Sequence, residues 1–121
     1  MKRTMFQLYL EDCDEAIEVY TKAFDATVEA IYRDDTGKIL HAEIIAFDQY
    51  IALSEIDKPS IAGNTMQFCF QLGEAGEASV IKAYDVLKED AKIDYSLGAI
   101  EWSRKMFSLV DRFGVYWCVF V

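Results

Sequence analysis

The sequence is poor in the residues that bind metals or cross-link small folds: its 121 residues include three cysteines and one histidine. Cys13, Cys69 and Cys118 are an odd number, and no two of them form a CxxC pair. This spacing predicts neither a disulfide framework nor a structural zinc site. We therefore expect a reduced, cytosolic protein.

Positive charge is also scarce, with 12 Lys and Arg residues against 21 Asp and Glu residues and a net charge of −9. Nucleic acids and anionic membranes are bound by clustered basic residues, so both are excluded as expected partners. The acidity favours either simple solubility or attraction of a cationic ligand. The apolar run at 5–10 is too short for a signal peptide or a membrane span, and we expect neither.

Glycine-rich and nucleophile motifs are absent. The six glycines form no G-x-G-x-x-G, no P-loop and no G-x-S-x-G, and no paired-carboxylate signature indicates hydrolysis. Nucleotide binding and the common hydrolase mechanisms are therefore not predicted.

What the chain does have is a repeat with a spacing of sixty residues. Residues 7–10 (QLYL) align without a gap on 67–70 (QFCF), and 22–24 (KAF) align on 82–84 (KAY). A repeat of this length is one supersecondary unit, which needs a second copy to bury its apolar face. With 53% hydrophobic residues, the chain should fold as one ordered domain built from two such modules.

Periodicity predicts a βαβββ order in each module. The first module, 1–56, should contain a strand at 5–10, a helix at 13–24 capped by Asp12, and strands at 27–33, 38–47 and 50–54, with a turn at 48–49. Residues 57–64, which include the only proline, should be a linker. The second module, 65–121, should contain a strand at 66–72, a helix at 74–88, and strands at 93–102, 106–110 and 115–121.

Several short motifs occur in the same order as in a known family: Glu15-Ala16 with Tyr20, His41-Ala42-Glu43, Trp102, Asp111-Arg112-Phe113-Gly114 and Trp117. The chain thus resembles the vicinal oxygen chelate superfamily of glyoxalases, bleomycin-resistance proteins and extradiol dioxygenases, and within it the PhnB-like family. It departs from the family pattern at Val19 and at Met106-Phe107. The resemblance implies an α+β fold in which tandem βαβββ modules form a curved mixed sheet around a cleft that binds a small organic molecule, often in a homodimer.

In metal-using members of the superfamily, His or Glu residues on the first and last strand of each module hold a divalent ion. By the family register those positions fall on Phe6, Met66, Ala52 and Cys118. They supply one thiol and no hard donor, so we expect no metal and no other cofactor. Glu55 lies nearby, but recruiting it requires a slip by an odd number of residues, which would turn the side chains of the strand to the opposite face.

An apolar pocket is the alternative use of these positions, and we predict Phe6, Met66, Trp102 and Cys118 as ligand-binding residues. The acidic charge favours a cationic or aromatic ligand stacked on Trp102. Gln7 and Gln67 recur at equivalent positions, but the same register turns them away from the cleft.

Catalytic residues are not defined by the sequence. His41 and Glu43 are the only candidates, since they share a strand face and the carboxylate could orient the imidazole as a general base. The simpler interpretation is that His41 and Glu43 form a structural cross-strand polar pair. Three hypotheses remain open: a metal-free binding protein, a glyoxalase- or dioxygenase-type enzyme with a shifted metal site, and a structural dimerisation module whose groove is filled by its own side chains.

Overall fold

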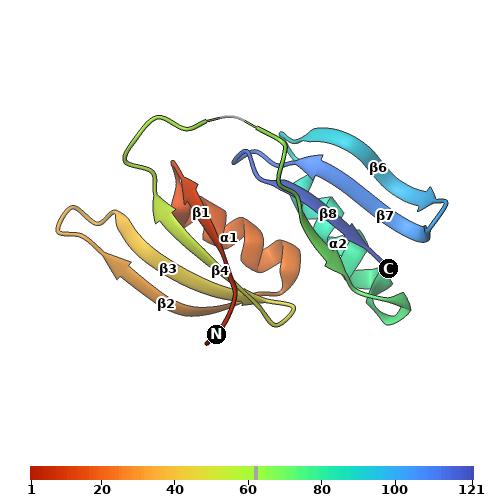
Figure 1. Ribbon diagram of the computed structural model, residues 1–121, viewed down its shortest axis with the longest axis horizontal. Helices are drawn as coiled ribbons and strands as arrows, with labels where there is room; N and C mark the ends of the chain where they lie inside the picture. Colours follow the sequence, from red (N-terminus) through yellow and green to blue (C-terminus); the bar gives the residue numbers. More distant parts are fainter. Residues whose placement is uncertain (62) are drawn as a thin grey trace. The chain divides into compact units, whose positions relative to one another are not determined.

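The computed structural model describes residues 1–61 and 63–121, which divide into two compact units, Met1–Ser60 and Ile61–Val121 (Figure 1). The elements follow in the order β1 (Met5–Leu10), α1 (Cys13–Phe24), β2 (Thr27–Arg33), β3 (Ile39–Ala46), β4 (Gln49–Glu55), β5 (Phe68–Gln71), a 3₁₀ turn η1 (Glu74–Gly76), α2 (Glu77–Leu87), β6 (Lys92–Ile100), β7 (Ser103–Val110) and β8 (Tyr116–Phe120). Each unit is a βαβββ module, which confirms the predicted α+β class and the tandem repeat.

In the first unit, the described strands form one mixed sheet in the order β1-β4-β3-β2. Strands β1 and β4 are parallel, and the other neighbours are antiparallel. Helix α1 packs against β3 and β4 (Figure 1). Tyr20 and Phe24, one helical turn apart, stack with ring centroids 5.9 Å apart and are fully buried with Ile44 and Ile51 of the sheet. This apolar face fixes α1 on one side of the sheet.

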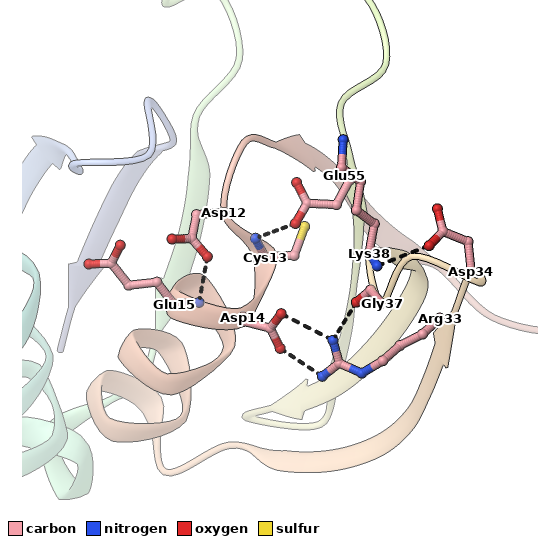
Figure 2. A network of polar contacts seen from close by, with 9 residues as sticks. All are labelled: Asp12, Cys13, Asp14, Glu15, Arg33, Asp34, Gly37, Lys38 and Glu55. Carbon is pink, nitrogen blue, oxygen red and sulfur yellow. Dashed lines mark hydrogen bonds and ion pairs between the residues drawn. The ribbon is translucent and has the colours of Figure 1, made fainter.

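The start of α1 is held by side chains from distant parts of the chain (Figure 2). Asp12 accepts a hydrogen bond from the backbone N–H of Glu15 at 3.1 Å, as its predicted N-cap role requires. The Glu55 carboxylate accepts a second one from the backbone N–H of Cys13, also at 3.1 Å. Asp14 forms a bidentate ion pair with Arg33. Glu55, the last residue of β4, thus helps Asp12 to cap the start of the helix.

The β3–β4 turn lies one residue earlier than predicted. Phe47 and Asp48 both have positive φ, 49° and 64°, which is the pattern of a tight two-residue hairpin turn. The Phe47 ring packs edge-on against Phe24, with centroids 6.0 Å apart. We attribute the left-handed conformation of this bulky residue to that contact at the end of α1.

In the second unit, the described strands form a mixed sheet in the order β5-β8-β7-β6, with β5 and β8 parallel. Helix α2 packs against β7 and β8. The Tyr84 ring of α2 contacts Phe107 of β7 at 5.2 Å between centroids. Trp117 of β8 is fully buried and stacks on Phe70, so the core of this unit lies between α2 and the sheet.

The second helix begins later than the predicted residue 74, because η1 precedes it. A Cβ atom at Gly76 would lie 2.4 Å from Cβ of Leu72, so only glycine fits this close approach. Strand β5 is also shorter than the predicted 66–72. In neither described range is a helix long and apolar enough to cross a membrane.

Candidate functional site

A pocket of about 240 Å³ lies on the second sheet, on the face opposite α2. Phe107 points toward α2, so its neighbours Met106 and Ser108 point to the other face. Ser108 pairs with Cys118 of β8, which shares that face. The residues that line the pocket are Gln67, Asp94, Tyr95, Ile100, Trp102, Met106, Ser108, Tyr116 and Cys118.

A chain of hydrogen bonds crosses the pocket floor. The Gln67 amide donates to Ser108 Oγ at 3.0 Å, and Ser108 Oγ donates to Asp94 Oδ2 at 3.0 Å. The Tyr116 hydroxyl donates to the same Asp94 oxygen at 2.8 Å. The hydrogen bond to this carboxylate raises the pKa of Tyr116 above its ordinary value of 10.0. Tyr116 therefore remains a neutral donor at neutral pH.

Charge in the pocket has one sign. Asp94 is the single acidic residue of the lining, and the lining contains no Lys, Arg or His. Both hydrogen bonds to Asp94 end on Oδ2. Its other oxygen accepts none from the residues that the structure describes, so it is available to a donor on a ligand.

Two exposed aromatic residues line the same pocket as the Asp94 carboxylate. Tyr95 and Trp102 line the pocket with more than half of each residue exposed. The Trp102 ring packs edge-on against Phe120 at 4.9 Å between centroids, which orients the indole and leaves it accessible. Exposed aromatic faces next to a carboxylate suit a cationic or aromatic molecule.

Two of the four predicted ligand-binding residues, Trp102 and Cys118, line this pocket. Met66 is 73% exposed and outside the lining. Phe6 lies in the first unit. Its side chain projects from the same face of β1 as that of Leu8, a buried core residue, and from the face opposite to that of Gln7. The ligand role of all four residues remains a prediction.

The orientation predicted for Gln67 was wrong, since its side chain lines the pocket and contacts Ser108. The reason is strand parity. Cys118 pairs with Cys69 of β5, and two residues back from Cys69 is Gln67, not Met66. The family register applied to 66 and 118 thus placed residues of opposite faces in one site.

Sequence reasoning also missed Asp94, Ser108 and Tyr116. Asp94 and Tyr116 lie in segments predicted as strands, but no motif marks them, and their convergence depends on the pairing of β6, β7 and β8. The register between β6 and β7 is irregular, so the alternation of side chains along β6 does not predict the face from which Asp94 projects. Serine and tyrosine carry no spacing signal of their own.

His41 and Glu43 do contact each other, as predicted, with 2.8 Å between Nε2 and Oε2. Arg3, which the sequence did not single out, forms an ion pair with the same carboxylate at 2.9 Å and lies over the Tyr50 ring at 4.3 Å. Hydrogen bonds from His41 and then Arg3 hold the pKa of Glu43 below its ordinary 4.5. Glu43 is thus a weakly basic carboxylate held by two partners, and a catalytic role for the pair remains a prediction.

Metal-ligating side chains are dispersed. Within residues 1–61 and 63–121, no group of three or more His, Cys, Asp or Glu residues could hold a metal ion. Glu55, the residue nearest a shifted ligand position, accepts a hydrogen bond from the backbone N–H of Cys13 at the start of α1. The donor set does not fit the divalent metal that some superfamily members use.

Comparison with known proteins identifies the class. The sequence model of the Glyoxalase/Bleomycin resistance protein/Dioxygenase superfamily matches residues 2–119. The chain therefore belongs to this superfamily. No curated protein matches the chain.

Solved structures show the same fold. The chain is similar to protein PA1353 from Pseudomonas aeruginosa, with a TM-score of 0.83 and 21% identity, covering 99% of this chain and 97% of that one. It is similar to the PhnB protein from Bacillus cereus, with a TM-score of 0.80 and 22% identity, covering 99% and 98%. FosX from Listeria monocytogenes, a fosfomycin resistance protein solved with Mn(II) and sulfate, matches with a TM-score of 0.70 and 10% identity, covering 98% and 87%.

Proposed function

We propose that this protein is a metal-free binding protein for small organic cations, and that the pocket of the second unit is its binding site. The observation that carries the proposal is the lining: one carboxylate, Asp94, beside exposed aromatic rings, with no basic residue. A volume of about 240 Å³ lies below the usual range for drug-sized ligands, so the pocket suits a small molecule such as a single-ring amine. The net charge of −9 adds long-range attraction for cations.

Each part of the pocket has a proposed task. The free oxygen of Asp94 pairs with an ammonium group, while Ser108 and Tyr116 hold the carboxylate in place. The face of Trp102 stacks on the ligand ring and contributes about 0.5–2 kcal/mol through its attraction for the cation. Met106 and Cys118, both nearly buried, form the apolar floor.

A metal-dependent enzyme is the alternative that the superfamily suggests, because FosX was solved with Mn(II). The metal-donor side chains of the residues that the structure describes are scattered and do not support it. A structural dimerisation module is the third possibility, and it predicts that no small molecule binds. We also propose a homodimer in a reducing cytosol, since the sheets end in edge strands that a second copy could cover.

The test compares two probes of nearly equal shape, benzylamine, which is cationic at neutral pH, and benzyl alcohol, which is neutral. Calorimetric titration should show tighter binding of benzylamine. Asp94→Asn should remove most of that difference, and Trp102→Leu should weaken benzylamine more than benzyl alcohol. Added salt should reduce the preference.

Asp35→Asn is the matched control, because it removes the same charge from an exposed turn of the first unit. It should leave the preference for benzylamine nearly unchanged. Equal binding of both probes, or stronger binding of benzoate than of benzylamine, would overturn the proposal.

A further inference from the structure

Two cysteines face each other across the parallel strands of the second sheet. Cys69 of β5 and Cys118 of β8 are partners in register, so their side chains project from the same face. Neighbouring strands lie about 4.8 Å apart. That spacing is within the Cα separation of about 4.4–6.8 Å that a disulfide needs.

One of the two thiols lines the pocket, and the other is hydrogen-bonded to a lining residue. Cys118 lines the pocket directly. The Cys69 thiol donates a hydrogen bond to Oε1 of Gln67 at 3.6 Å, and Gln67 is also a lining residue. The cysteine pair is therefore continuous with the hydrogen-bond chain that runs from Gln67 through Ser108 to Asp94.

The two thiols differ in accessibility. Cys69 is exposed, whereas Cys118 is 6% exposed. Burial, and next the neighbouring Cys69, raise the pKa of Cys118 to about 12, so it is a poor first target for an oxidant. Strand β5 is a four-residue edge strand, which can shift to bring the sulfur atoms together.

We propose that Cys69 and Cys118 are a peroxide-sensitive dithiol that closes to an intramolecular disulfide on the pocket floor. Cys69 attacks a hydroperoxide, which breaks the O–O bond, gives a sulfenic acid on Cys69 and releases water or an alcohol. The Cys118 sulfur then attacks the Cys69 sulfur, the S–O bond breaks, and the thiol proton leaves with hydroxide as water. Two thiols are oxidised and one hydroperoxide is reduced.

Closure also affects the pocket. The disulfide removes the S–H that Cys69 donates to Gln67. Gln67 then loses one of the two contacts that hold its amide, the other being Ser108. Oxidation should therefore change the pocket floor directly beside Asp94, whatever ligand the pocket binds.

The experiment treats the reduced protein with one equivalent of hydrogen peroxide, blocks free thiols with iodoacetamide and maps the peptides by mass spectrometry. The expected product has lost two hydrogen atoms, contains a Cys69–Cys118 crosslink, and returns to the dithiol with dithiothreitol. Cys13, which is fully buried in the first unit, should remain a free thiol. A disulfide between two chains, or oxidation of Cys69 to sulfinic acid in place of the crosslink, would overturn the proposal.

Variants separate the roles of the two sulfurs. Cys118→Ser should stop at the sulfenic acid, which dimedone traps on Cys69, while the wild-type protein yields much less of that adduct. Cys69→Ser changes an exposed residue and should slow thiol oxidation by peroxide at least tenfold, and Cys13→Ala should leave the crosslink yield unchanged. Equal dimedone labelling of the wild type and Cys118→Ser contradicts a resolving role for Cys118. If Cys118→Ser fails to fold, the wild-type crosslink map and Cys69→Ser decide the outcome.

Discussion

At the residue scale, Glu43 shows how one carboxylate can be held by two partners. His41 and Arg3 both contact it, and its side chain is 14% exposed. A group whose folded-state pKa is lowered stabilises the fold above its unfolded pKa, and that stabilisation is lost as pH falls through the folded pKa. Glu43→Gln should therefore lower the free energy of unfolding at neutral pH, and the difference from wild type should shrink below pH 4.5.

Urea denaturation at neutral pH and at successively lower pH measures this difference. Glu29→Gln removes an exposed carboxylate from β2 and serves as the control for the change in net charge. The electrostatic account of Glu43 is wrong if Glu43→Gln is as stable as wild type at neutral pH, or if its deficit grows on acidification.

The candidate site was partly predictable from the sequence at this scale. The contact of His41 with Glu43 follows from strand alternation, since residues two apart share a face. Arg3 precedes the first strand, where no periodicity fixes a side chain. The position of Asp94 in the site was not predicted for a related reason, because the register of β6 with β7 is irregular.

At the element scale, the turn between β7 and β8 explains a family motif. The buried Asp111 carboxylate accepts hydrogen bonds from the backbone N–H groups of Phe113 and Val115 and from Nε1 of Trp117. Gly114 takes the positive φ of 87° that the turn needs. The Asp111–Gly114 motif is thus a structural clamp on the hairpin, and it lies outside the pocket lining.

Asp111→Ala should destabilise the protein by about 3 kcal/mol, because it leaves buried donors without an acceptor. Asp34 holds the β2–β3 turn in the same way, through the backbone N–H groups of Thr36 and Lys38, but it is only half-buried. Asp34→Ala is therefore the matched control and should cost clearly less, since water can replace its bonds. Equal losses of stability in chemical denaturation would refute this difference between the turns.

Most element positions followed from the sequence. The bounds of α1 and β1 were predicted correctly, because amphipathic spacing and the Asp12 cap agree. The later start of α2 was not predictable, since it depends on the contact between Gly76 and Leu72. The position of the turn at Phe47 was missed for a similar reason, because the contact with Phe24 overrides the preference of turns for polar residues.

At the scale of the whole molecule, the first prediction concerns metals. A ligand raises the melting temperature only by binding the folded state, and the described residues offer no cluster of metal donors. Zinc, nickel and manganese should therefore leave the melting temperature unchanged in a thermal-shift assay. A rise of several degrees that Glu55→Gln abolishes would favour the metal-dependent enzyme instead.

The second prediction at this scale concerns assembly. Both sheets end in edge strands, and Ile31 and Tyr32 of β2 are exposed apolar residues at one such edge. We expect light scattering at micromolar concentration to give the mass of a dimer. Replacing Ile31 with Lys should shift the mass toward the monomer, whereas Leu40→Lys changes an exposed residue of β3 and is the control. A monomeric wild type would contradict the proposed dimer.

The central claim is that the pocket of the second unit binds organic cations, and the two tryptophans allow a direct test. The Trp102 indole lines the pocket, whereas the Trp117 indole is fully buried and donates to Asp111 at 2.8 Å. In a ¹H–¹⁵N spectrum, each indole N–H gives a separate signal. Titration with benzylamine should shift the Trp102 signal progressively, benzyl alcohol should shift it less, and Trp117 should stay nearly still. A Trp102 signal that does not move, or that moves as far with benzoate, would contradict the claim.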